Sequence, residues 1–169
     1  ATYYAFSNLH WSEIGYSPFI IGVLWSTGVL AEIVLLAYAK RIQRTFSAHV
    51  LIGIGGAGAL VRWAATGYAP PLTALFFLQA LHALTFAATF LGTIKFVEES
   101  TPPELRNTAM ALASTLGVGA ITGIATIIAG YIFAASGPVA AYGLMAAMGM
   151  TTVAIAGGLW VHQGRRRAV

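Results

Sequence analysis

Long apolar runs constrain the fold of this chain more than any other feature of its sequence. They approach or exceed the ~20 residues that an α-helix needs to cross about 30 Å of hydrocarbon. Their apolar side chains are not confined to one stripe, which is typical of helices that face lipid, and the runs are too long for barrel strands. They cover residues 18–38, 50–68, 72–94, 108–135 and 139–161. The pattern predicts an all-α membrane protein that crosses the bilayer several times.

The composition agrees with a location in the lipid bilayer. Charged residues make up 8% of the chain, whereas a soluble domain carries about 25%. Hydrophobic residues make up 58%, and the mean hydropathy is +0.78. The chain has no cysteine, which excludes disulfides and cysteine metal sites. No nucleophile with its base, metal-ligand cluster or phosphate-binding glycine loop is evident either, so we expect neither an enzyme nor a cofactor.

The first segment differs from the others in length. Residues 1–11, ATYYAFSNLHW, look like the last turns of a helix that is cut at its front. We therefore expect residues 1–169 to form a single transmembrane bundle of six helices with a truncated first helix. The segment carries no basic region of the kind that begins a signal peptide. If the first helix is complete in the natural protein, it begins in the cytoplasm.

The basic residues predict the orientation of the bundle. All the Lys and Arg residues except Arg62 lie in alternate connections, near residues 40–44, 95–106 and 165–167, whereas residues 12–17, 69–71 and 136–138 carry none. Cytoplasmic loops of membrane proteins hold the excess of Lys and Arg. We expect these basic loops and the C-terminus to be cytoplasmic, in a multi-pass protein of a bacterial inner membrane. The pI near 9.7 then requires no nucleic-acid partner.

Arg62 is the exceptional basic residue, because it lies inside the glycine-rich apolar run Val50 to Tyr68. An arginine at the centre of a membrane helix costs roughly 3 kcal/mol on insertion scales, unless it faces a polar interior and finds a partner. Such residues often mark substrate or ion pathways. A structural ion pair or a snorkelling side chain remains the alternative. Glu32 and His82, in the neighbouring runs, are the candidate partners.

The depths of these three residues predict a polar ladder. At 1.5 Å per residue, Arg62 lies roughly 9 Å from the outer end of its span, His82 roughly 15 Å and Glu32 roughly 21 Å. His82 is therefore placed to bridge the two charges. For His82, the alternative is a hydrogen-bonded histidine in the core. For Glu32, the alternative is a buried partner that only neutralises an arginine on the missing half.

Helical spacing assigns faces to the surrounding residues. Three stripes are expected to face one another: Gly55, Gly58 and Arg62; Trp25, Gly28 and Glu32; and Gln79, His82, Thr85 and Phe86. Small residues on such faces let helices approach closely in membranes. For the same reason, the aligned Gly119, Gly123 and Gly130 predict close packing of a later helix. Tyr4, with Tyr3, Phe6 and Asn8, is a candidate for lining a cavity.

Several motifs together resemble the C-terminal half of a major facilitator superfamily transporter. They are the basic segment Lys40-Arg41-Ile42-Gln43-Arg44 after the second helix and the stretch TPPELRNTAMALASTLGVGAITGIATIIAGYIF (Thr101 to Phe133). More narrowly, GYSPFIIGVLWSTGVLAEI, LVRWAATG and QALHALTFA resemble the branch that contains the phenylpropionate and lactose permeases. The resemblance covers nearly the whole chain and implies half of that superfamily's fold.

The lactose-permease resemblance carries over only in part. Arg62 and His82 lie at positions where that permease has an arginine and a histidine used in proton coupling and sugar binding. One turn beyond the histidine, that permease has a glutamate, where this chain has Thr85. One turn before the histidine, it has a lysine, where this chain has Gln79. The permease's coupling scheme therefore does not transfer whole, unless Glu32 handles the proton instead.

The resemblance implies a function in transport. We expect half of a secondary active transporter, a proton-coupled symporter for a small organic acid or a similar polar solute. Its expected partners are the lipid bilayer, a missing N-terminal half or another membrane protein chain, and a small-molecule substrate. The expected substrate and proton pathway consists of Arg62, His82, Glu32, Gln79, Trp25 and Tyr4.

A structural role is the alternative. A truncated transporter half could persist as an accessory subunit of a larger membrane complex, since a lone bundle has a half-site and no opposing gate. Stable copurification with such a complex, with Arg62 facing protein rather than water, would favour this role. A companion gene for a first half would favour transport.

Overall fold

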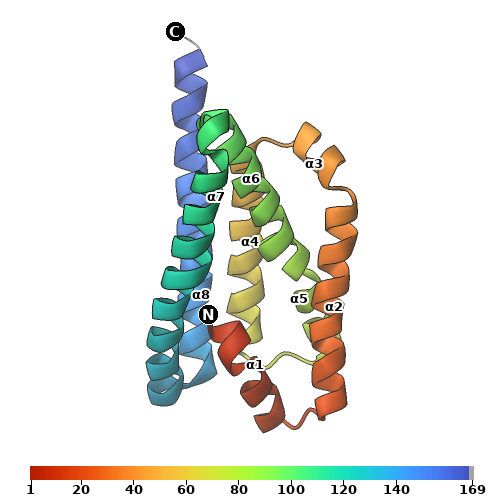
Figure 1. Ribbon diagram of the computed structural model, residues 1–169. Coiled ribbons are helices and arrows are strands. Elements are labelled where there is room, and N and C mark those ends of the chain that lie inside the picture. Colours follow the sequence, from red (N-terminus) through yellow and green to blue (C-terminus); the bar gives the residue numbers. More distant parts are fainter. Residues whose placement is uncertain (168–169) are drawn as a thin grey trace.

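The computed structural model describes the backbone of residues 1–167 and the side chains of residues 1–161. This part of the chain is helical and contains no strand, and Figure 1 shows its long helices running side by side. The elements are α1 (Thr2–Glu13), α2 (Pro18–Ala37), α3 (Ala39–Thr45), α4 (Ala48–Thr66), α5 (Leu72–Ala80), η1 (Ala83–Ala88), α6 (Thr89–Ser100), η2 (Pro103–Leu105), α7 (Arg106–Ala113), η3 (Ser114–Ile121) and α8 (Thr122–Arg167). The predicted all-α class is confirmed.

Four helical stretches are long and apolar enough to cross a membrane: Pro18–Ala37, Ala48–Thr66, Leu72–Ser100 and Pro103–Val161. The last one contains two antiparallel arms, because α8 reverses its direction at Gly137 (Figure 1). Gly137 has φ 78° and ψ −177°, a backbone conformation that glycine tolerates and other residues rarely adopt. Pro138 follows and cannot continue the helix before it.

The connections with basic residues lie at one end of the bundle. Figure 1 shows α3, the connection from α6 to α7 and the end of α8 at this end, and the α1–α2, α4–α5 and Gly137 turns at the other. The basic segment Lys40–Arg44 forms helix α3 rather than a loop. The Nζ of Lys95 donates to the carbonyl oxygens of Gln43 and Phe46, which stabilises the C-terminal end of α3.

Glycines bring α4 close to its neighbours. A Cβ on Gly56 would lie 2.9 Å from the carbonyl oxygen of Gly149 in α8, and a Cβ on Gly149 would lie 2.8 Å from that of Gly56. On the face predicted from the sequence, a Cβ on Gly58 would lie 3.1 Å from the Cβ of Leu84, and one on Gly55 would overlap Thr89. α4 therefore packs tightly against both α8 and the η1–α6 segment.

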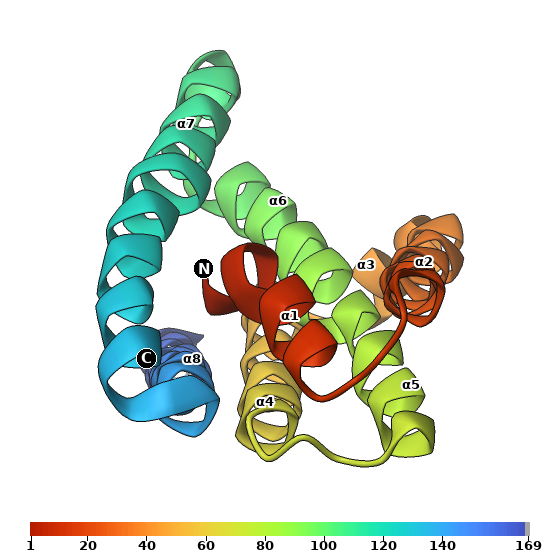
Figure 2. The same ribbon diagram turned by 90° about the horizontal axis from the view of Figure 1, so that it is seen from below.

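The expectation of close packing at Gly119 and Gly123 is wrong for the residues that the structure describes. A Cβ at either position would meet nothing within 4 Å, and one at Gly130 would meet only the ring of Phe6. The reason is that α7, η3 and the first arm of α8 form an outer helix, visible at the edge of Figure 2. Much of its apolar surface is exposed; Val118, for example, is 70% exposed.

The core is built around α1, which Figure 2 shows among α8, α4, α6 and α2. Its Tyr3 and Trp11 are buried against Leu24, Trp63 and Tyr142. Two segments have π-helical geometry that the sequence does not predict, η1 and η3. Such segments inside α-helices frequently occur at functional sites, and η1 begins directly after His82.

Candidate functional site

Arg62 is fully buried and bonded to one neighbouring helix. Its side chain is 0% exposed. Nη1 donates to Oγ1 of Thr85 at 3.0 Å and lies 3.0 Å from Nδ1 of His82. Nη2 donates to Oε1 of Gln79 at 2.8 Å. The arginine at membrane depth is therefore bonded to three uncharged acceptors rather than to a carboxylate.

A single helical stretch supplies all three acceptors. Gln79, His82 and Thr85 follow one another at intervals of three residues, across the junction between α5 and η1. The hydroxyl of Thr85 also donates to the carbonyl oxygen of His82 at 3.3 Å. The stripe predicted from the sequence therefore does face Arg62, and Gly58 allows α4 to approach it closely.

Two aromatic rings enclose the guanidinium. Its Cζ lies 4.5 Å from the ring centroid of Tyr3 and 4.2 Å from that of Trp63. A desolvated arrangement of this kind contributes about 2 kcal/mol through cation–π attraction. The Tyr3 hydroxyl donates to Oε1 of Gln79 at 2.8 Å, so that α1 closes the network. Two buried donors, Nε of Arg62 and Nε2 of Gln79, have no hydrogen-bond partner among the side chains that the structure describes.

His82 connects Arg62 to Glu32. Nε2 of His82 lies 3.3 Å from Oε2 of Glu32, while Nδ1 faces Arg62. An arginine offers only donors, so Nδ1 must accept and the ring hydrogen must lie on Nε2, directed at the carboxylate. Gly28 permits the contact, because a Cβ there would lie 3.4 Å from the Cβ of His82. His82 thus bridges the two charges, as the depth estimate predicts.

Trp25 and Tyr4 lie beside this network, and among the described side chains neither one hydrogen-bonds to Arg62. The Nε1 of Trp25 donates to Oδ1 of Asn8 at 2.7 Å. The ring of Trp25 lies 4.4 Å from that of Tyr3 and 5.8 Å from that of Tyr4. All six predicted pathway residues therefore lie in one region, and their roles in transport stay predictions.

Sequence reasoning missed Trp63 as a member of the network, and it did not assign to Tyr3 the stacking on Arg62. Helical spacing placed Thr85 on the correct face, but the hydrogen bond from Arg62 to its hydroxyl was not predicted. No comparable signal existed for Trp63, which follows Arg62 directly in the sequence and faces elsewhere on an ideal helix. It reaches the guanidinium because a long arginine side chain can fold toward its neighbour.

Two cavities adjoin the network. The first, called the arginine cavity, has a volume of about 180 Å³ and is lined by Tyr3, Tyr4, Ala59, Arg62, Trp63, His82, Thr85, Phe86 and Met145. Its walls combine aromatic rings with the cation and the imidazole. Few polar groups among mostly aromatic walls are typical of sites for small organic ligands.

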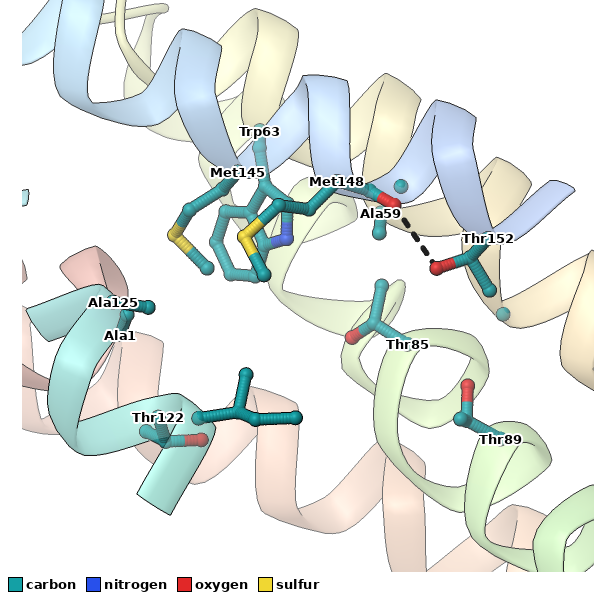
Figure 3. Close-up of a pocket in the computed structure, with 14 residues that line it drawn as sticks. Ala1, Ala59, Trp63, Thr85, Thr89, Thr122, Ala125, Met145, Met148 and Thr152 are labelled. Atoms are coloured by element: carbon teal, nitrogen blue, oxygen red, sulfur yellow. Dashed lines mark hydrogen bonds between the residues drawn. The ribbon is translucent and has the colours of Figure 1, made fainter. Parts of the chain in front are cut away.

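The second, called the threonine cavity, has a volume of about 200 Å³ and is shown in Figure 3. It is lined by Ala1, Gly55, Gly56, Ala59, Trp63, Thr85, Thr89, Ile121, Thr122, Ala125, Met145, Met148, Gly149 and Thr152. One of its hydroxyls, that of Thr152, is bonded to the carbonyl oxygen of Met148. Among the described side chains no charged one lines it, whereas Arg62 lines the arginine cavity.

Comparison with known proteins identifies the family. Residues 1–144 match the model of the MFS_1 like family. The chain belongs to this family. It is 32% identical over 133 residues to the probable 3-phenylpropionic acid transporter of Escherichia coli (strain K12), an alignment that covers 79% of the chain and 35% of that protein. It is 26% identical over 126 residues to the uncharacterized transporter YwbF of Bacillus subtilis (strain 168), covering 75% of the chain and 32% of that protein.

The chain therefore spans about a third of the length of the curated relatives that it matches. These relatives are named as transporters rather than enzymes, which agrees with the function expected from the sequence. The predicted resemblance to a half of a major facilitator superfamily transporter is confirmed. No solved structure matches the chain.

Proposed function

We propose that this chain forms one half of a proton-coupled symporter for a small organic acid. The observation that carries the proposal is Arg62: a cation buried at membrane depth whose bonds all go to uncharged groups. Buried charges in membrane helices are costly and usually functional. A substrate carboxylate supplies the anionic partner that the guanidinium lacks, and its two oxygens match the fork of N–H donors.

The substrate is an acid with an aromatic or similarly apolar body. The arginine cavity offers the rings of Tyr3, Tyr4, Trp63 and Phe86 beside the cation, so that an apolar body packs on the rings while the carboxylate meets Arg62. The name of the Escherichia coli relative, a probable 3-phenylpropionic acid transporter, supports this choice of substrate.

Glu32 and His82 form the proton site. Glu32 lies within the span predicted for residues 18–38, and its carboxylate faces the imidazole at 3.3 Å. Histidine is the side chain whose charge changes most readily between pH 5 and 8. The pair lies in the same network as Arg62, so proton binding acts directly on the residue that holds the substrate.

A second bundle completes the carrier. Secondary transporters of this kind rock one bundle against the other around a site near the midplane. The second bundle is either a segment joined to this chain or a separate chain. The bundle lies in a bacterial inner membrane, with the basic end that carries α3 in the cytoplasm, because of the charge distribution over the connections.

The test is uptake by what we call the paired carrier: this chain produced with its natural first half or, failing that, with the N-terminal half of the Escherichia coli relative. Cells or proteoliposomes with the paired carrier should accumulate labelled 3-phenylpropionate when the inside is alkaline. Exchange of Arg62 for glutamine should abolish uptake. Arg44→Gln is the matched control, since it removes an exposed cation of α3 and should leave uptake intact. Absence of uptake by every paired carrier would refute the proposal.

One observation favours a second candidate, a structural accessory subunit of a larger membrane complex. Arg62 is 0% exposed and its hydrogen bonds all go to protein groups, which is also the behaviour of a purely structural arginine. This role predicts stable copurification with a large complex and no transport by any paired carrier. Uptake that depends on Arg62 would contradict it.

A further inference from the structure

The contact between Arg62 and His82 allows only one protonation state of the imidazole. Nη1 of Arg62 lies 3.0 Å from Nδ1 of His82, and a guanidinium has donors but no acceptor. Nδ1 therefore carries no hydrogen while this contact exists. The other ring nitrogen, Nε2, directs its hydrogen at Oε2 of Glu32 at 3.3 Å. The imidazole is neutral in this arrangement, and both of its nitrogens are occupied.

A proton added to the ring breaks the contact. The lone pair of Nδ1 is the site that can accept it, so an N–H bond forms there and the hydrogen bond from Arg62 is lost. Two cations would then lie 3.0 Å apart in a site with little water, where like charges repel strongly. Glu32 remains bonded to the imidazolium through Nε2. The guanidinium is the group that has to move.

The groups around His82 support movement of Arg62 rather than of the imidazole. The ring of Phe86 stacks on the imidazole at 5.5 Å, and Tyr3 of α1 lies 6.2 Å away. Arg62 of α4 and Glu32 of α2 are the charged groups that contact it among the described side chains. The imidazole is thus held by a ring on its face and a carboxylate on its edge, while the long arginine side chain borders a cavity.

We propose that His82 is the positioning residue that decides whether Arg62 is held or presented to a substrate. A proton from water outside the membrane bonds to Nδ1, the hydrogen bond from Nη1 of Arg62 breaks, and the guanidinium turns into the arginine cavity. A carboxylate then binds its free N–H groups. On the inner side the proton leaves Nδ1 for water, Arg62 returns to the imidazole and the carboxylate is released. This inference rests on the proposed function.

The formal charges of the network fix the stoichiometry. Glu32 is negative, Arg62 is positive and His82 is neutral, so that the three groups together carry no net charge. A carboxylate that entered alone would leave the buried site negative, which is costly in a medium of low polarity. A single proton on His82 restores neutrality. The inference therefore predicts symport of one proton with each monocarboxylate, without net movement of charge across the membrane.

The tautomer can be tested on the chain itself, in lipid nanodiscs, by nitrogen NMR with labelled histidine and arginine. The chain contains four histidines, and the His82→Asn variant identifies the His82 signals. At about pH 8, where histidine is ordinarily neutral, His82 should carry its hydrogen on Nε2. As the pH is lowered, protonation of Nδ1 and a change in the side-chain signals of Arg62 should occur together. A hydrogen on Nδ1 at high pH, or unchanged Arg62 signals when His82 is protonated, would overturn the inference.

His82→Asn and His49→Asn form a matched pair for a functional test. An asparagine oxygen at position 82 can still accept from Arg62 but cannot take up a proton, whereas His49 is buried and its Nδ1 has no hydrogen-bond partner among the described side chains. In the paired carrier with His49→Asn, lowering the pH over the range in which His82 becomes protonated should raise the affinity for 3-phenylpropionate. The expected increase is about tenfold for each pH unit. With His82→Asn the change should stay below about twofold. The same pH dependence in both variants would contradict the inference.

Two further probes keep the outcome interpretable. The neutral amide of the same acid should bind with little dependence on pH, because it requires neither the proton nor the charge of Arg62. Thr85→Val removes another hydrogen-bond acceptor of Nη1. Arg62 is then held less strongly, so it should be released at a higher pH. An unchanged pH of release would contradict the inference, even if His82→Asn fails to fold. If uptake persists and its pH dependence is the same in the His82→Asn and Thr85→Val variants as in the unchanged carrier, the proposed function stands and only the role of His82 is refuted.

Discussion

Nη1 of Arg62 and Nδ1 of His82 lie 3.0 Å apart in the centre of the bundle. This contact joins α4 to the residue that directly precedes η1, and the other nitrogen of the ring extends the connection to Glu32 on α2. A cation and an anion on two different helices are therefore linked through one titratable ring. Any change in the charge of that ring acts on both helices at once.

Arg62→Lys should weaken uptake of a carboxylate substrate strongly. Lysine keeps the charge but loses the fork of donors that fits a carboxylate. Loss of one charge-assisted hydrogen bond costs about 1.5–3 kcal/mol, which corresponds to a decrease in affinity of about tenfold to a hundredfold. The measurement is concentration-dependent uptake of 3-phenylpropionate by the paired carrier. Normal uptake by Arg62→Lys would show that the arginine is not a two-point ligand of the carboxylate.

Glu32→Gln should shift the pH dependence of uptake toward lower pH. A carboxylate next to an imidazole favours the protonated ring, so its removal means that more acid is required for the same degree of protonation. The glutamine oxygen still accepts from Nε2 of His82, and the fold should persist. Uptake is measured across a series of pH values. Glu99→Gln is the control, since Glu99 is half exposed and pairs with Lys95 at the basic end; a pH profile identical in both variants would place the proton site elsewhere.

Gly149→Leu should destabilise the bundle, whereas Gly119→Leu should not. A side chain at Gly149 would collide with the backbone of α4, and overpacking of this kind costs about 1–3 kcal/mol. At Gly119 nothing lies within reach, so the change should stay within about 0.5 kcal/mol. Unfolding of the two purified variants in mild detergent measures the difference. Equal stability would contradict the described crossing of α4 and α8.

The orientation of the bundle can be tested by labelling. Cysteine can be introduced without a competing thiol, because the chain has none. Residue 43 lies on α3 at the basic end, and residue 137 lies at the opposite turn. A membrane-impermeant reagent should label Gly137→Cys from outside the cell and Gln43→Cys only after the membrane is opened. Labelling of both residues from the same side would contradict the topology.

The positions of Arg62, His82 and Glu32 could be predicted because depth along a helix follows from residue count alone. The rise per residue and the outer ends of three spans sufficed to place the histidine between the charges. Helical spacing likewise placed Gln79 and Gly28 on the correct faces. These inferences need only the geometry of single helices.

The rest depended on how helices meet, which spacing does not specify. The π-helical turn after His82 has no clear signature in the sequence, and the stacking of Tyr3 on Arg62 requires the position of α1 in the bundle. For the glycines, spacing shows that one face of a helix carries only small residues. It does not show whether another helix packs against that face. Spacing therefore does not distinguish Gly119 and Gly123 from Gly55 and Gly58, although only the latter pair lies against another helix.

Proton symport through Arg62 can be measured directly as accumulation driven by a pH gradient. Proteoliposomes that contain the paired carrier are held at zero membrane potential with an alkaline interior, and 3-phenylpropionate and proton entry are recorded together. The carboxylate should accumulate with one proton per molecule, in the Arg44→Gln variant as in the unchanged carrier, and accumulation should be lost with Arg62→Gln. Equal accumulation with Arg62→Gln, or entry of the carboxylate without protons, would rule out proton symport through Arg62.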